Sequence, residues 1–279
     1  MEIVVANSAG FCFGVKRAIR MAFDAARKHP PPLFSLGPLI HNPQVVRQLE
    51  EVGVTTIDDL RVVERGTVIL RSHGVTKDDL ALLKTRGLPV VDATCPFVKK
   101  AQRYARSLST QGYTVVIVGD RGHPEVQGIL SYIEGEGIAA GSPNEVRVRP
   151  SVRKIGVVAQ TTQVYENFQD VVARALTLAR EVRAYNTICD ATHIRQQESV
   201  ELARRVDSMI VIGGYNSANT SRLTNLCRAA QPNTHHVEME QEIDAAWFEG
   251  VGTVGITAGA STPNWLIDRV REEILRQVS

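Results

Sequence analysis

The stretch IVVANSAGFC at residues 3–12 runs from an apolar, β-branched segment through a short polar turn to a cysteine. Two later stretches have the same character, PVVDATC at residues 89–95 and AYNTIC at residues 184–189, and a helical pattern follows each of the three. A strand that leads through a loop into a helix is the repeating step of a parallel α/β fold. Because this step recurs with a cysteine at the same point, the sequence predicts three related α/β units.

Other segments extend the same alternation of strands and helices. The β-branched runs are VVIVG at 115–119, IGVVA at 155–159, MIVIGG at 209–214 and VGITAG at 254–259. The amphipathic patterns typical of helices fall at 16–28, 98–112, 165–182, 195–206 and 263–278. Strands that alternate with helices in this way favour parallel sheets with helices covering them.

Two polar loops follow each cysteine at the ends of predicted strands. The first loop lies 28 or 29 residues after the cysteine and carries His41, His123 or Ser217, and the second carries His73, Thr161 or Ser261. The units are about 90 residues long, which predicts domains at 1–95, 96–189 and 190–279, the last with a C-terminal helix. Ligands of parallel α/β units bind beyond the carboxyl ends of the strands. A threefold arrangement of the units would therefore converge these loops on one central cleft.

Length, charge and composition exclude several classes of protein. The chain has 279 residues, of which 32 are basic and 30 acidic, giving a formal net charge of +2. That charge is too small for a protein whose main partner is nucleic acid or an anionic membrane. No apolar run approaches the roughly 18 residues that cross a bilayer, and the opening residues lack the pattern of a signal peptide. We expect a cytoplasmic protein with no nucleic-acid or membrane partner.

Three of the four cysteines stand where a metal ligand or nucleophile would be placed. Cys12, Cys95 and Cys189 each precede a helix, whose positive end favours an ionised thiol. A zinc site remains open, but structural zinc sites favour closely spaced cysteine pairs, which the sequence lacks. Widely separated thiolates fit an iron–sulfur cluster that leaves one iron open as a Lewis acid. Cys227 shares a helical face with two leucines, which predicts a core residue.

The polar loops admit a structural and a functional interpretation. Ser217 and Ser261 stand where helix caps are expected, and lone histidines usually serve as ordinary hydrogen-bonding residues. Helix N-termini together with Ser, Asn and His side chains also form a cradle of neutral donors for phosphate. Since these loops contribute no Lys or Arg to the cradle, the functional interpretation predicts a small, enclosed phosphoester.

Glu125 likewise admits two interpretations. It follows His123-Pro124, so it could simply complement the dipole in the first turn of a helix. The functional interpretation is a general acid beside an open iron. Loss of a hydroxyl group as water needs a proton on the leaving oxygen, and a carboxyl group that is shielded from water and has a raised pKa can deliver it.

The motifs together resemble one family of enzymes. They are GFCFGVKRAI, GPLIHNPQVV, RSHGV, DATCPFV, GHPEVQG, AQTT, NTICDAT with the following RQ, NSANTSRL and ITAGASTP. In order, over essentially the whole chain, they are similar to the 4-hydroxy-3-methylbut-2-enyl diphosphate reductases, the LytB family. These enzymes catalyse the last step of the methylerythritol phosphate route of isoprene biosynthesis.

The resemblance implies a fold, a cofactor and a reaction. The implied fold class is α/β, with three pseudo-repeated parallel-sheet units in a trefoil-like arrangement around a central cavity. Cys12, Cys95 and Cys189 would hold a [4Fe–4S] cluster with one open iron, which would bind the allylic hydroxyl of the substrate. Two electrons from ferredoxin or flavodoxin, with two protons, would then give water plus isopentenyl or dimethylallyl diphosphate.

The resemblance also implies roles for the loop residues. Glu125 would supply protons, and Thr161 would contact the substrate and share in catalysis. The diphosphate would be bound by His41, His73, His123, Ser217, Ala218, Asn219 and Ser261. Two positions depart from the family pattern. Ala218 lacks the serine hydroxyl that contacts diphosphate in many relatives, so its backbone N–H alone would contribute. Ile194 replaces a polar residue before Arg195-Gln196.

Two other functions remain open at this point. A cluster-dependent hydro-lyase acting on a small phosphorylated substrate would also use an open iron and an acid, but it would consume no net electrons. An electron carrier or redox sensor would need a fourth thiolate, which Cys227 would supply. A requirement for reductant separates the first from the main hypothesis, and the effect of Cys227→Ser on the cluster separates the second.

Overall fold

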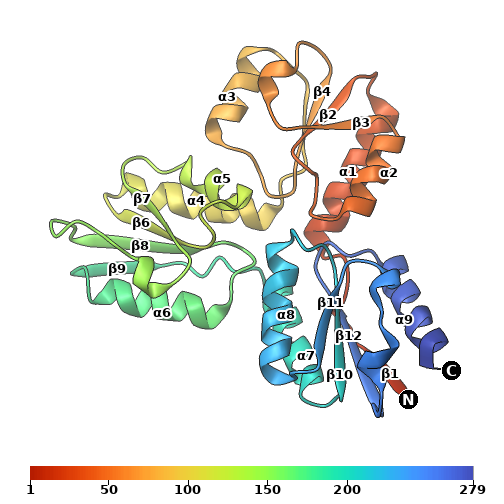
Figure 1. Cartoon of the computed structure of the whole chain (residues 1–279). Coiled ribbons are helices and arrows are strands. Elements are labelled where there is room, and N and C mark those ends of the chain that lie inside the picture. The colour runs from red at the N-terminus through yellow and green to blue at the C-terminus, as the bar shows by residue number, and fades with distance from the viewer. Residues whose placement is uncertain (279) are drawn as a thin grey trace. The chain divides into compact units, whose positions relative to one another are not determined.

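Three parallel, four-stranded sheets with flanking helices make up the chain (Figure 1). The structure is a computed structural model, and it describes residues 1–278. The strands are β1 Glu2–Val5, β2 Leu33–Leu36, β3 Val54–Ile57, β4 Thr67–Leu70, β5 Val90–Asp92, β6 Thr114–Val118, β7 Gly137–Ala140, β8 Lys154–Ala159, β9 Glu181–Ala184, β10 Ser208–Ile212, β11 Thr234–Val237 and β12 Thr253–Ala258. The helices are α1 Phe13–Lys28, α2 Pro43–Glu51, α3 Lys77–Thr85, α4 Pro96–Thr110, α5 Pro124–Leu130, α6 Tyr165–Leu176, α7 Asp190–Ala203, α8 Ala218–Ala230 and α9 Asn264–Val278.

The three sheets share one strand order. The orders are β3-β2-β4-β5, β7-β6-β8-β9 and β11-β10-β12-β1, and all the pairings are parallel. In each sheet the two inner strands lead into the two polar loops, and one edge strand leads towards a cysteine. The predicted repeat of α/β units is therefore present in the strand order as well as in the sequence.

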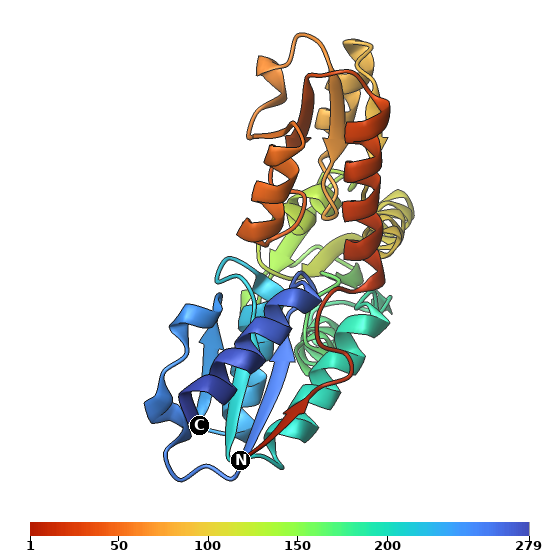
Figure 2. The same cartoon turned by 90° about the vertical axis from the view of Figure 1, so that its right-hand side faces the viewer.

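The first strand of the chain belongs to the last sheet. β1 pairs with β12 in the register Glu2 to Thr253 and Val5 to Ile256 (Figure 2). The predicted ranges 1–95, 96–189 and 190–279 placed this strand with the first unit. The difference has a structural reason, because each cysteine follows the last strand of its own sheet. Cys12 therefore ends the sheet that the C-terminal part of the chain builds.

One predicted helix is shorter than expected. The pattern at residues 165–182 predicted a single helix, whereas α6 ends at Leu176 and the chain then turns into β9. Val182 lies in β9 opposite Ile155 of β8, so its apolar character serves the sheet.

The inner strands of the second sheet are buried on both faces, as the strands of parallel sheets generally are. In the second sheet, Val116 and Val118 of β6 pack into one core cluster. Val115 and Ile117 of the same strand pack into the cluster on the other face. Continuous β-branched runs such as VVIV satisfy both faces at once, which explains why these strands lack polar alternation.

The chain divides into two compact units. One comprises Met1–Val15, His41–Pro43 and Asp190–Ser279, and it contains the sheet with β1, β10, β11 and β12. The other comprises Lys16–Ile40 and Gln44–Cys189, and it contains the other two sheets. Within residues 1–278, no helix is long and apolar enough to cross a membrane.

Candidate functional site

Every predicted site residue lies at or near the carboxyl end of a strand or at the start of a helix. The unit with the third sheet carries Cys12, His41, Ser217, Ala218, Asn219 and Ser261. The unit with the other two sheets carries His73, Cys95, His123, Glu125, Thr161 and Cys189.

The same backbone hydrogen bond fixes each of the three cysteines. The N–H of Cys95 donates to the Ser72 carbonyl at 2.9 Å, that of Cys189 to the Thr161 carbonyl at 3.0 Å, and that of Cys12 to the Ala260 carbonyl at 3.2 Å. The acceptors are Thr161 itself and the neighbours of His73 and Ser261. The backbone of each cysteine is therefore tied to the second polar loop of its own sheet, as expected if the two act together.

The three cysteines differ from Cys227 in their surroundings. Cys12, Cys95 and Cys189 are half-buried. Cys95 directly precedes α4, and the N–H of Val15 in α1 donates to Cys12 Sγ at 3.5 Å. Cys227 is fully buried, and burial raises the pKa of its thiol to about 12. The prediction that Cys227 is a core residue is confirmed.

Local hydrogen bonds explain the turn that leads from β5 to Cys95. The Asp92 carboxylate accepts from the N–H of Thr94 at 3.0 Å and from Lys99 Nζ at 2.5 Å. Burial raises the pKa of Asp92, but the hydrogen bonds from Lys99 and Thr94 outweigh it and leave the pKa below its ordinary value. The ionised Asp92 thus braces the sequence DATC between the end of the strand and the first turn of α4.

Glu125 and Thr161 form a buried pair. The Glu125 side chain is 2% exposed, and Thr161 is 6% exposed. The Thr161 N–H donates to Glu125 Oε1 at 2.6 Å, and the Thr161 hydroxyl donates to Oε2 at 2.8 Å. Both carboxylate oxygens are therefore held by one residue, which brings the two predicted catalytic residues into direct contact.

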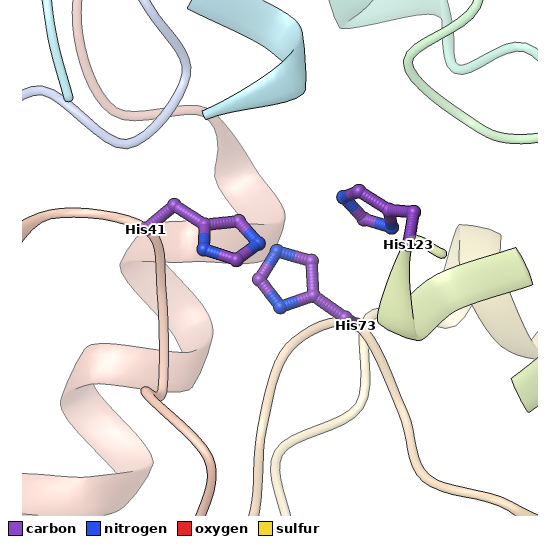
Figure 3. Close-up of side chains that lie close together, drawn as sticks. All are labelled: His41, His73 and His123. Carbon is purple, nitrogen blue, oxygen red and sulfur yellow. The ribbon is translucent and has the colours of Figure 1, made fainter. Parts of the chain in front are cut away.

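Two of the predicted histidines lie together in the same unit. The rings of His73 and His123 meet edge to face, with centroids 5.5 Å apart (Figure 3). His123 also caps α5, because its Nδ1 accepts from the N–H of Glu125 at 3.1 Å. Figure 3 draws His41 as well, which belongs to the other unit.

The other unit gathers polar groups at the start of α8. Ser217 caps this helix, and its hydroxyl accepts from the N–H of Thr220 at 3.3 Å. Asn219 is 7% exposed, and its amide nitrogen has no hydrogen-bond partner among the described residues. The Ser261 hydroxyl donates to the His41 carbonyl at 3.0 Å. A buried donor without a partner at a helix N-terminus is suited to an anionic ligand.

The two departures from the family pattern differ in position. Ala218 is half-buried and is the first residue of α8. Ile194 is 55% exposed on α7.

The profile of the family described as LytB protein matches residues 3–275 of the chain. The chain belongs to this family. A relative in Geobacter sulfurreducens, named 4-hydroxy-3-methylbut-2-enyl diphosphate reductase, is 59% identical over 274 residues and is matched over 98% of this chain and 97% of its own. A relative of the same name in Pelobacter propionicus is 57% identical, with 98% of both chains covered.

Solved structures agree with this assignment. A structure of (E)-4-hydroxy-3-methyl-but-2-enyl diphosphate reductase, described as the terminal enzyme of the non-mevalonate pathway, is 43% identical. It has a TM-score of 0.73 and covers 99% of this chain and 100% of that one. A Plasmodium falciparum reductase structure has a TM-score of 0.90 at 24% identity, with 97% and 87% of the two chains covered, and supports the fold alone. The family resemblance and the α/β fold class predicted from the sequence are confirmed.

Proposed function

We propose that the chain is a 4-hydroxy-3-methylbut-2-enyl diphosphate reductase. It removes the allylic hydroxyl group of (E)-4-hydroxy-3-methylbut-2-enyl diphosphate as water and gives isopentenyl and dimethylallyl diphosphate. One C–O bond breaks, one C–H bond forms, and the balance requires two electrons and two protons. The observation that carries the proposal is the buried Glu125–Thr161 pair, which is tied by the Thr161 carbonyl to the N–H of Cys189.

The cysteines fit a cluster with three protein ligands. Cys12, Cys95 and Cys189 are half-buried thiols at or next to helix starts, and the N–H of Val15 donates to the first of them. Hydrogen bonds from backbone amides to sulfur are a usual feature of iron–sulfur sites. Cys227 is protonated and fully buried, so it is unsuited to be a fourth ligand. A [4Fe–4S] cluster held by the three would supply single electrons and one iron with an open coordination position.

Glu125 supplies a proton to the leaving hydroxyl group. Its carboxyl group is shielded from bulk water, and Thr161 fixes both of its oxygens. A fixed carboxyl group loses little freedom when it meets the substrate, which favours proton transfer. The Thr161 hydroxyl, which donates to Glu125 Oε2, would also contact the hydroxyl oxygen of the substrate.

The diphosphate is held by neutral donors. These are the side chains of His41, His73, His123, Ser217, Asn219 and Ser261, with the backbone N–H of Ala218. The N-terminus of α8 adds its dipole, and the buried Asn219 amide donates the hydrogen bond that the described residues leave unmade. This explains how a chain with a net charge of only +2 can bind a diphosphate.

The electrons come from a small carrier of the ferredoxin or flavodoxin class, and the enzyme works in the cytoplasm. Both statements are proposals that rest on the resemblance to the family. One proposed thiol ligand follows the last strand of each sheet: Cys95 follows β5, Cys189 follows β9 and Cys12 follows β1. The bounds 1–95, 96–189 and 190–279 stay a prediction for the three α/β units.

The test is the substitution Glu125→Gln. The amide keeps the size of the side chain but cannot deliver a proton, so turnover with a chemical reductant should fall by about 10²–10⁴-fold. Circular dichroism and the electron paramagnetic resonance spectrum of the cluster should be unchanged. The matched control is Glu134→Gln, an exposed glutamate of the same unit. Turnover by Glu125→Gln at the rate of this control would remove Glu125 from the reaction.

A further inference from the structure

Arg195 is a buried arginine on α7 that the proposed reaction does not use. Its side chain is 3% exposed. The guanidinium Nε and Nη2 donate to the Ser8 carbonyl at 3.0 and 2.6 Å, and Nη2 also donates to the Gly10 carbonyl at 2.6 Å. Charge-assisted hydrogen bonds of this length are among the stronger ones in proteins. One side chain of α7 therefore donates hydrogen bonds to two carbonyl groups of the segment that ends at Cys12.

Glu198, one turn further along α7, holds the N–H groups of the same segment. Its Oε1 accepts from the N–H of Asn7 at 2.7 Å and its Oε2 from the N–H of Ser8 at 2.8 Å. Burial raises the pKa of Glu198, but hydrogen bonds from Ser8 and Asn7 outweigh it and leave the pKa below its ordinary value. Glu198 is therefore ionised at neutral pH. Arg195 and Glu198 bind complementary groups of residues 7–10.

The far end of this segment is fixed as well. Gly10 has φ of +94°, and a Cβ atom built there would lie 2.8 Å from Asn264 Oδ1 at the start of α9. The N–H of Cys12 donates to the Ala260 carbonyl. The segment has little regular structure of its own, so its conformation depends on these contacts with α7 and α9.

We infer that Arg195, aided by Glu198, is the positioning residue that sets the place of the Cys12 thiol as a cluster ligand. The inference rests on the proposed function of Cys12. α7, which carries both residues, begins at Asp190. It directly follows Cys189, another proposed cluster ligand. The approach to Cys95 is held differently: Asp92 accepts from the Thr94 N–H and from Lys99, and the half-buried Arg17 donates to the Thr94 carbonyl at 3.2 Å.

The charge of Arg195 has an electrostatic consequence. A guanidinium bound to the Gly10 carbonyl lies on the segment that delivers a thiolate to the cluster. A nearby cation favours the more negative, reduced state of a cluster and so raises its reduction potential. Removal of the cation should move the potential to a more negative value.

The first experiment uses the iron-free full chain. Iodoacetamide is added, and the alkylation rates of Cys12, Cys95 and Cys189 are followed by mass spectrometry. In Arg195→Gln the Cys12 rate should rise about tenfold, because at least one charge-assisted hydrogen bond that restrains the segment is lost. The other two rates serve as internal controls and should stay within about twofold. Arg195→Lys retains the positive charge but loses the planar guanidinium group that donates from two nitrogens. It should therefore give an intermediate Cys12 alkylation rate.

The second experiment uses protein reconstituted with iron and sulfide under anaerobic conditions. Arg195→Gln should show an altered electron paramagnetic resonance spectrum, a more negative midpoint potential and faster loss of iron to a chelator. The matched control is Arg204→Gln, an exposed arginine just beyond the end of α7, which should behave as the unmodified chain. A wild-type Cys12 alkylation rate together with a wild-type spectrum would overturn the inference.

A second pair of variants keeps the inference testable if Arg195→Gln does not fold. Glu198→Gln should also raise the Cys12 alkylation rate, whereas Glu201→Gln, on an exposed position of the same helix, should not. If Glu198→Gln leaves the rate unchanged, the inference fails. Failure of the unmodified chain to bind iron would instead contradict the proposed function, and the alkylation rates would still judge the role of Arg195.

Discussion

Cys227 shows how burial alone separates a structural thiol from one that can bind metal. It lies on α8 among Leu202, Val211 and Leu223, with no exposed surface. The apolar surroundings disfavour the thiolate and raise the pKa from an ordinary value of 9.0 to about 12. The folded protein therefore favours the neutral thiol of Cys227 over its thiolate.

This pKa shift predicts a pH dependence of stability. A folded-state pKa above the unfolded one contributes stability that is present below pH 9 and is lost as the pH rises towards 12. The free energy of unfolding should fall by about 1.4 kcal/mol for each pH unit in this range because of Cys227. Urea unfolding of the iron-free chain at pH 8 and pH 10.5 measures it. In Cys227→Ala the free energy of unfolding should decrease less between the two pH values. An equal decrease in both proteins would contradict the raised pKa of Cys227.

The hydroxyl group missing at Ala218 can be restored. Ala218 begins α8, next to the Ser217 cap and the buried Asn219 amide. In Ala218→Ser, a new hydrogen bond to a charged phosphate oxygen is worth about 1.5–3 kcal/mol. That corresponds to roughly a tenfold or greater fall in KM with little change in kcat. Ala229→Ser, exposed on the same helix, is the control. An unchanged KM would mean that position 218 does not face the diphosphate.

At the residue scale, recurrence along the sequence singled out the cysteines and the polar loops as candidate site residues. Three thiols at equivalent points are hard to attribute to chance, and so are His41, His123 and Ser217 at nearly equal offsets from them. Arg195 had no such signal beyond its place in the RQ motif. Its partners Ser8 and Gly10 lie more than 180 residues away, so only the tertiary structure shows its contacts.

At the scale of single elements, α3 offers a test that is independent of the site. Thr76 caps this helix in a capping box, because its hydroxyl accepts from the Asp79 N–H and the Asp79 carboxylate accepts from the Thr76 N–H. Thr76→Ala should lower the free energy of unfolding by about 1 kcal/mol without affecting turnover. Thr85→Ala, at the exposed end of the same helix, should change it by less than about 0.5 kcal/mol. Equal urea midpoints for the two variants would refute the cap.

The boundaries of helices and strands were predictable where the apolar residues followed a single pattern, either that of a helix or that of a strand. The start of α6 at Tyr165 and the strand at Lys154–Ala159 follow from clear apolar patterns. The end of α6 did not, because β9 is an edge strand of mixed character whose Val182 fits a helical pattern equally well. Its pairing with Ile155 of β8, a contact distant in sequence, decides its structure.

At the scale of the whole molecule, the repeating unit of the sequence and the sheet of the structure are offset by one strand. Each cysteine begins a repeat in the sequence, but it ends a sheet in the structure. β1 therefore leaves the N-terminal region and pairs with β12. Periodicity could reveal three units, whereas only the pairing of strands reveals where each unit begins.

We propose that the chain performs a reduction that requires three of its four cysteines. The most direct measurement is turnover of the allylic diphosphate by anaerobically purified protein, with and without a chemical reductant, beside iron quantitation. We predict about four irons per chain, consumption of two electrons for each water released, and isopentenyl and dimethylallyl diphosphate as products. Substitution of Cys12, Cys95 or Cys189 by serine should abolish turnover, but Cys227→Ser should not. Water loss without reductant would contradict the account and indicate a hydro-lyase.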